Sequence, residues 1–216
     1  DDVVMTDVSP FSVGIETATK LKNGTVIGGF FQPIIERNTP LPASRQSSFS
    51  TMDDNQTQLR VDIYQGEAPK VSDNVHLGQF NLDVPKGKAG HEGMFVRITY
   101  DPSGLIEVEA TSISTGKKAG LVIRDNVSNL TEADIAKRLK QMQTFKMHPR
   151  EDEENTAFLA RIRRLYEMAT GDDRHLLQGM LMEFESALEG QDPAEISRMR
   201  GDMGETLDRI DDYYVS

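Results

Sequence analysis

The chain contains 216 residues, carries a formal net charge of −11 at pH 7 and contains no cysteine. An acidic surface disfavours phosphate backbones and anionic membranes, because both are bound by basic patches, and the lack of cysteine excludes disulfides and thiol chemistry. The apolar runs also fall short of the roughly 18 residues of a membrane span. We therefore expect no nucleic-acid partner and no membrane partner, and we take the cytoplasm as the expected location.

The first half of the chain, from residue 13 to about residue 123, has the pattern of β-strands separated by turns. Asn23-Gly24 predicts a type I′ hairpin turn between strands at residues 15–21 and 26–31, because both residue types accept the positive φ that this turn requires. The nearby Gly28-Gly29 pair predicts a strand bend or a close backbone approach rather than a phosphate-binding loop.

Further along the β half, apolar and polar residues alternate in short segments. The alternation covers residues 59–64, 96–100 and 106–110, and a Pro-Ser-Gly turn at 102–104 separates the last two. A period of two with one apolar face indicates half-buried antiparallel strands. Several such strands at short spacing predict a sandwich or a barrel.

After about residue 128 the apolar residues recur with the period of helices. Thr131 stands three residues before Asp134, which predicts a helix N-cap. Pro149 is expected to end or kink the first helix, and Pro193 to open the last. The apolar stripes predict short antiparallel helices packed together. These stripes are Ile135, Leu139 and Met142; Phe158, Ile162 and Leu165; Leu177, Leu181, Phe184 and Leu188; and Ile196, Met199, Met203, Leu207 and Ile210.

The residue types that commonly carry catalysis or bind metals form no recognisable motif. The four histidines (His76, His91, His148 and His175) lie far apart without metal-ligand spacing. Phosphate-binding loops, dinucleotide-binding glycines and nucleophile elbows are absent from the sequence. The acidic runs at residues 152–154 and 172–173 are expected at helix starts, where they complement the helix dipole. We predict a non-enzyme, although a hydrolase with an unmarked pair of carboxylates stays open at this level.

Six segments of the β half occur in the order and near the spacing of the heat-shock 70-kilodalton chaperone family. They are residues 7–17 (DVSPFSVGIET), 35–42 (IERNTPLP), 49–56 (FSTMDDNQ), 64–67 (YQGE), 73–82 (DNVHLGQFNL) and 104–108 (GLIEV). The chain therefore resembles the substrate-binding domain of this family, and the run at 31–39 (FQPIIERNT) looks closest to the HscC branch. The helical half matches in position only, because its short helices and Pro149 depart from the long lid helix of the DnaK type.

The resemblance implies an α+β fold in which an antiparallel β-sandwich is followed by a small C-terminal α-helical bundle. It divides the chain into an interdomain linker (residues 1–8), a peptide-binding β-sandwich (9–128) and a helical lid subdomain (129–216). The implied function is that of a chaperone substrate-binding fragment, which holds extended apolar polypeptide segments in a channel through the sandwich. The implied partners are unfolded or extended polypeptides, a J-domain co-chaperone and an ATPase domain upstream in the full-length protein.

By resemblance, the peptide-binding positions fall on ten residues: Val13, Ile15, Thr17, Ala18, Phe49, Ser50, Met52, Gln56, Leu59 and Val61. Without the resemblance, the apolar members of this set would be read as sandwich core. Ala18 and Met52 match two side chains that meet above the bound backbone in the family. Their sizes are exchanged relative to the DnaK pattern, so Met52 alone is expected to close the channel.

The resemblance also implies a coupling segment. Val3, Val4 and Met5 match the apolar stretch of the family's interdomain linker, and Asp7 and Arg37 match positions tied to coupling with the ATPase domain. Taken alone, the apolar stretch reads as a tail or an edge strand. ATP and magnesium are implied for the ATPase domain, which these residues do not include, so we expect no cofactor here and nucleotide regulation only in the joined protein.

Two other functions remain open from the sequence. One is a structural or self-association module in which the channel is closed and the helices form a dimer surface. The other is a carbohydrate-active sandwich enzyme or lectin, which the absence of tryptophan and the presence of only five tyrosines weaken, because sugars stack on such rings. Peptide binding tests the first of these alternatives, and glycan binding tests the second.

Overall fold

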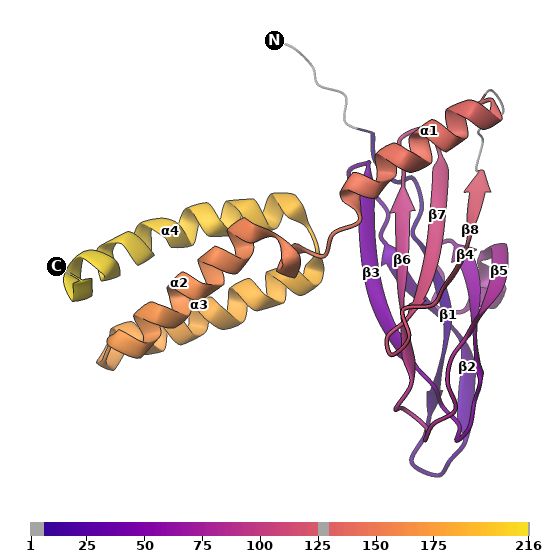
Figure 1. Cartoon of the computed structure of the whole chain (residues 1–216), viewed down its shortest axis with the longest axis horizontal. Helices are drawn as coiled ribbons and strands as arrows, with labels where there is room; N and C mark the ends of the chain where they lie inside the picture. The colour runs from indigo at the N-terminus through magenta and orange to yellow at the C-terminus, as the bar shows by residue number, and fades with distance from the viewer. Residues whose placement is uncertain (1–6, 125–129, 216) are drawn as a thin grey trace. The chain divides into compact units, whose positions relative to one another are not determined.

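The computed structural model describes residues 7–124 and 130–215 and divides the chain into two compact units, Asp1–Lys146 and Met147–Ser216. The first unit contains all of the described strands and one helix, and the second is helical (Figure 1). The predicted linker stretch of Val3, Val4 and Met5 lies outside the described residues.

Two four-stranded antiparallel sheets form the first unit and confirm the predicted β-sandwich. The first sheet has the order β2 (Val26–Ile35), β1 (Val13–Lys20), β4 (Gln58–Gln65) and β5 (Val75–Asp83). The second has the order β3 (Ala43–Ser50), β6 (Gly93–Tyr100), β7 (Leu105–Ser112) and β8 (Lys118–Arg124). A short 3₁₀ turn, η1 (Val71–Asp73), precedes β5.

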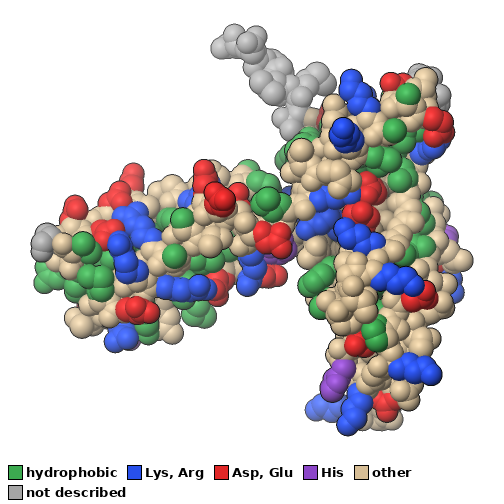
Figure 2. Space-filling view, in the orientation of Figure 1, with side chains coloured by type: hydrophobic (Ala, Val, Ile, Leu, Met, Phe, Trp, Pro, Cys, Tyr) green, Lys and Arg blue, Asp and Glu red, His purple; other side chains and the backbone are tan. Residues whose placement is uncertain are grey.

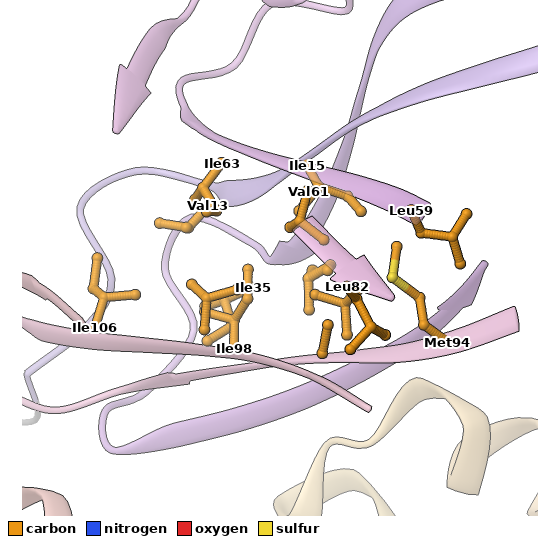
Figure 3. Packing of buried hydrophobic residues seen from close by; sticks show 14 of the residues in the cluster. Val13, Ile15, Ile35, Leu59, Val61, Ile63, Leu82, Met94, Ile98 and Ile106 are labelled. Carbon is orange, nitrogen blue, oxygen red and sulfur yellow. The ribbon is translucent and has the colours of Figure 1, made fainter. Parts of the chain in front are cut away.

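The sandwich core lies between the two sheets. Alternate residues of each strand point inward, as the period of two predicts, so that Val13 and Ile15 of β1 and Ile63 of β4 are buried against Ile98 of β6. Figure 3 shows these side chains packed in one cluster, with Leu59 and Met94 at one end of it and Ile106 at the other. The end of this cluster that contains Leu59 and Met94 opens into the groove described below.

The predicted hairpin between β1 and β2 is present, but its turn differs from the predicted type I′. Leu21 N donates to Thr25 O at 2.8 Å, so three residues rather than two form the loop. Only Gly24 of the Asn23-Gly24 pair has a positive φ, at 84°. Asn23 instead accepts a hydrogen bond from Thr25 N through its side-chain oxygen, at 3.0 Å. Such local side-chain bonds are the usual alternative by which asparagine stabilises turns.

Helix α1 (Glu132–Met142) packs with the sandwich rather than with the other helices. Its Ile135 and Met142 are buried with Leu105 of β7, and Figure 1 shows the helix crossing the end of the strands. Thr131 caps it as predicted, since the hydroxyl accepts from Asp134 N and the Asp134 carboxylate accepts from Thr131 N, both at 3.1 Å. The sequence placed the domain boundary at 128/129, whereas the compact units divide at 146/147.

The segment that follows α1 corrects the predicted role of Pro149. The helix ends at Met142, and a 3₁₀ turn, η2 (Gln143–Phe145), follows it. Pro149 is instead the first residue of another 3₁₀ turn, η3 (Pro149–Glu151). The first N–H of such a turn has no partner within the turn, so a proline is tolerated there.

The second unit consists of α2 (Glu153–Met168), α3 (Gly171–Gly190) and α4 (Pro193–Val215). The three apolar stripes predicted after the first face its core, where Ile162, Leu165, Leu177, Phe184 and Leu207 are completely buried. The acidic runs do stand at helix starts, and the Asp152 carboxylate accepts a capping hydrogen bond from Asn155 N at 3.1 Å.

Acidic and basic side chains are mixed over the face seen in Figure 2, without one large basic patch. Among the helices that the structure describes, none is both long and apolar enough to cross a membrane.

Candidate peptide-binding groove

The central feature of the candidate site is the point at which β1 and β4 part. The two strands pair only from Val13 to Ile15 of β1, opposite Ile63 to Gln65 of β4. Beyond Ile15, β1 continues to Lys20 in pairing with β2, while β4 continues back to Gln58 in pairing with β5. The facing backbone edges of residues 16–20 and 58–62 are therefore not joined by the ladder.

A β-bulge interrupts the pairing of β1 with β2 a little beyond this point. Thr17 pairs with Phe30 and Thr19 pairs with Ile27, so Gly28 and Gly29 together lie opposite Ala18. Gly29 has a φ of 82°, which only glycine adopts readily. The expectation of a strand bend at the glycine pair is confirmed, and such bulges commonly change the direction of a strand beside a functional site.

A groove of about 800 Å³ occupies the space where the strands part. Its lining comes mainly from β1, from β3 and the loop that follows it, and from β4, with one residue each from β2 and β6. Eight of the ten predicted positions line it: Ile15, Thr17, Ala18, Phe49, Ser50, Met52, Gln56 and Leu59. The further lining residues are Glu16, Thr19, Lys20, Gln32, Ser48, Thr51, Arg60, Asp62 and Met94.

The floor of the groove is apolar. Ile15, Leu59 and Met94 are exposed by only 1%, 6% and 2%, so they belong to the sandwich core and to the groove at once. Figure 3 shows Leu59 and Met94 beside each other at the end of the core cluster. Val13 and Val61, by contrast, are completely buried and do not line the groove. For these two residues the structure supports the reading as core.

The loop after β3 forms one rim of the groove, and Gln56 organises it. The Gln56 side-chain oxygen accepts hydrogen bonds from Met52 N at 3.0 Å and from Asp53 N at 3.3 Å. Its side-chain nitrogen donates to Gln58 O at 2.8 Å. Gln56 therefore uses its amide to fix the backbone that presents Met52, a role that its place in the lining alone does not reveal.

Charged residues at the β4 side of the groove were missed by the sequence reading. Asp62, whose side chain is 7% exposed, accepts from Arg60 Nε at 2.7 Å and lies 3.1 Å from His76 Nε2. Arg60 also donates to the Gln79 side-chain oxygen at 2.7 Å. Met94 was missed as well, because it lies on β6 far along the chain and its alternating pattern identifies it only as core.

The two predicted coupling positions, Asp7 and Arg37, lie on adjacent segments of the sandwich. Leu41 N donates to Asp7 O at 2.8 Å, and Arg37 N donates to the Ser12 hydroxyl at 2.9 Å. Ser12 N in turn donates to the Glu67 carboxylate at 2.7 Å. This backbone bond is the main cause of a lowered pKa at Glu67. Partial burial acts against it, and the Ser12 hydroxyl and the Arg37 charge lower the pKa further.

The described residues contain no group of three or more histidine, aspartate or glutamate side chains that could hold a metal ion. The groove thus combines strand edges that the ladder leaves unpaired with an apolar floor and a hydrogen-bonded rim.

A family model described as "Hsp70 protein" matches residues 1–196 of the chain. The chain belongs to the Hsp70 family. It is 38% identical over 145 residues to a protein named "Chaperone protein DnaK" from Cenarchaeum symbiosum (strain A), an alignment that covers 67% of the chain and 21% of the relative. It is 39% identical over 137 residues to the protein of the same name from Nitrosopumilus maritimus (strain SCM1), covering 63% and 20%.

The chain thus corresponds to about one fifth of the length of these Hsp70 relatives. The predicted family is confirmed. Both relatives carry the DnaK name, and assignment to the HscC branch stays a prediction.

Proposed function

We propose that this Hsp70 chain binds extended, apolar polypeptide segments in the groove between β1, β3 and β4. The observation that carries the proposal is the separation of β1 from β4 beyond Ile15, above a floor of buried apolar side chains. An extended segment placed there finds backbone partners that are otherwise unpaired, as in other cases in which a peptide adds a strand to a sheet. The apolar floor then selects one side chain of that segment.

Burial of one apolar side chain and backbone hydrogen bonds both contribute to the expected affinity. Burying a leucine-sized side chain contributes about 1.5–3 kcal/mol, and each backbone hydrogen bond adds about 0.5–1.5 kcal/mol. These contacts act against an association cost of about 4–15 kcal/mol, and we expect a Kd of about 1 μM, which corresponds to about −8 kcal/mol. Backbone contacts do not distinguish sequences, so the groove is expected to accept many apolar segments.

The self-association alternative required a closed channel. A groove of about 800 Å³ with an apolar floor gives that alternative no support.

Regulation belongs to the same proposal. We infer that the chain itself has no catalytic activity and needs no cofactor, and that ATP and magnesium act through an ATPase domain joined to residues 1–8. Asp7 and Arg37 lie at one end of the sandwich in adjacent segments, which supports a coupling role for that end. Unfolded polypeptides and a J-domain co-chaperone are the proposed partners, and the cytoplasm is the proposed location.

A peptide titration tests the function. A fluorescent, uncharged peptide with a central leucine should bind with a Kd of roughly 1 μM. The same peptide with a central aspartate should bind much more weakly, because the floor offers no partner to a buried carboxylate. Absence of polarisation change with the leucine peptide at millimolar protein, or equal binding of both peptides, contradicts the proposal.

A further inference from the structure

One side chain links the two sides of the groove at its rim. Lys20, the last residue of β1, donates from Nζ to the backbone oxygen of Met52 at 3.3 Å and to Asp53 Oδ1 at 3.4 Å. Lys20 and Met52 both line the groove. The link joins a hairpin of the first sheet to a loop that follows an edge strand of the second sheet.

The loop side of this link is firmly held. In addition to the two hydrogen bonds that the Gln56 side-chain oxygen accepts, Asn55 N donates to Gly87 O at 2.7 Å, and Ala89 N donates to the Asp54 carboxylate at 2.9 Å. Thr51 N donates to Glu92 O at 2.9 Å and ties the start of the loop to the segment before β6. Asp53 is therefore presented from a fixed backbone.

The hairpin side is held differently. Every residue from 18 to 28 is exposed. The hydrogen bonds at its tip close the hairpin on itself, from Leu21 N to Thr25 O and from Gly24 N to Leu21 O. A segment with few buried contacts opens at low free-energy cost. The hairpin tip can thus move as a flap, and the bonds of Lys20 fasten it to the fixed loop.

We propose that Lys20 and Asp53 form an electrostatic strap across the groove, which a polypeptide must displace both when it enters and when it leaves. This inference rests on the proposed peptide binding and adds a gate to it. The side chains of Lys20 and Asp53 are 45% and 72% exposed, so the pair is screened by salt and individually weak. A weak strap slows exchange without preventing it.

The strap makes a prediction that distinguishes it from a contact with the peptide. Because the strap is formed in the empty groove and forms again over the bound peptide, breaking it should raise the association and dissociation rates of a peptide by the same factor. Exposed pairs of this kind change an equilibrium by roughly two- to fivefold. Lys20→Met should therefore raise both rates by about two- to fivefold and leave Kd within about twofold of the parent value.

The test is stopped-flow binding of an uncharged, fluorescent leucine-centred peptide to the full chain. Both rates of the parent should rise as the salt concentration increases from about 50 to about 500 mM, while those of Lys20→Met should stay nearly constant. Lys22→Met is the matched control, because it removes the same charge from the same hairpin at a position that makes no such bridge. Its rates should equal those of the parent and keep their salt dependence.

A charge exchange tests the pairing itself. Asp53→Lys should place two cations at the rim and raise both rates at least as much as Lys20→Met does, whereas Lys20→Asp combined with Asp53→Lys should restore rates near those of the parent. A parent chain that binds no peptide would contradict the proposed function. A parent that binds peptide with rates that neither Lys20→Met nor salt changes would instead contradict the strap alone. Equal rate changes in Lys22→Met would do the same.

Discussion

Removal of the Lys146 charge should destabilise the sandwich unit in a way that depends on pH. Lys146 Nζ lies 2.5 Å from Glu107 Oε1 and 2.9 Å from Glu109 Oε2, and the three side chains are exposed by only 8%, 11% and 28%. Glu107 Oε2 is buried without a hydrogen-bond partner. Lys146 therefore fastens the segment after α1 to β7 and neutralises two carboxylates that lie partly out of water.

The two carboxyl groups respond to this environment in opposite directions. Burial outweighs the bond and charge of Lys146 at Glu107 and raises its pKa. Burial also acts upward on Glu109, but the bond and charge of Lys146 outweigh it and lower the pKa of that group. In Lys146→Met the bonds and charge of Lys146 are lost and only the Lys118 charge still acts on Glu109, so the folded-state pKa values of both carboxyl groups should rise.

The sign and size of the effect follow from this. A carboxyl with a raised folded-state pKa stabilises the fold while it is protonated, and that stability is lost as the pH rises through the folded-state pKa. The substitution should thus cost little near pH 4 and most near pH 7. Breaking a fully buried pair costs about 3–5 kcal/mol. Because Glu109 is 28% exposed, we expect about 2–3 kcal/mol at neutral pH, or a fall in Tm of about 4–10 °C.

Thermal unfolding of the full chain at both pH values measures this cost, followed by circular dichroism in the β-sheet region to isolate the sandwich transition. Lys140→Met is the matched control, since Lys140 lies on the exposed face of α1 and its removal should change stability by less than about 0.5 kcal/mol. The reasoning is refuted if the loss of stability in Lys146→Met is the same at pH 4 and pH 7, or if Lys140→Met matches it.

Two further predictions concern the groove, and a third concerns nucleotide binding. Leu59→Phe should weaken peptide binding in fluorescence polarisation, because a larger ring at the floor fills the space of the guest side chain; unchanged affinity in a folded variant would remove Leu59 from the pocket. Met52→Ala should raise the peptide dissociation rate more than the association rate, at a cost of about 1–2 kcal/mol or roughly five- to thirtyfold in affinity. Ala18→Gly should have a much smaller effect. A dissociation rate of Met52→Ala equal to that of the parent would contradict the role of Met52 in closing the groove. Titration calorimetry with ATP and magnesium should give no heat of binding, since the sequence has no phosphate-binding loop, and a saturable signal would overturn that view.

Much of the fold follows from local patterns. The alternation at Leu59, Val61 and Ile63 identifies one face of β4 as buried, and the stripes of the helical unit identify its core. Thr131 and Asp152 identify helix starts, because capping is decided within four residues of chain. Such features depend on neighbours in sequence, so the sequence alone is sufficient to predict them.

Features that depend on a choice between two local conformations, or on distant partners, were not predictable in the same way. The type I′ turn was expected from Asn23-Gly24, but Asn23 bonds to Thr25 N and lengthens the loop. The first helix belongs to the sandwich unit because its apolar face meets Leu105, which no helical pattern reveals.

The candidate site shows the same division. The family resemblance located eight residues of the groove lining, yet it also included Val13 and Val61, which are completely buried in the sandwich core and do not line the groove. Periodicity places Val61 and Leu59 on one face of β4. Packing across the sandwich decides which of them lines the groove, since Leu59 is 6% exposed and Val61 is completely buried.

Hydrogen exchange along the backbone tests the central claim most directly, because it locates the bound chain as well as detecting it. With a saturating leucine-centred peptide, amides within residues 16–20 and within the rim at 49–52 should exchange more slowly than in the free chain. Amides of the outer strand β8 and of the core of the helical unit should be unchanged. Binding accompanied by no added protection in residues 16–20, or by protection confined to another surface, would contradict the account.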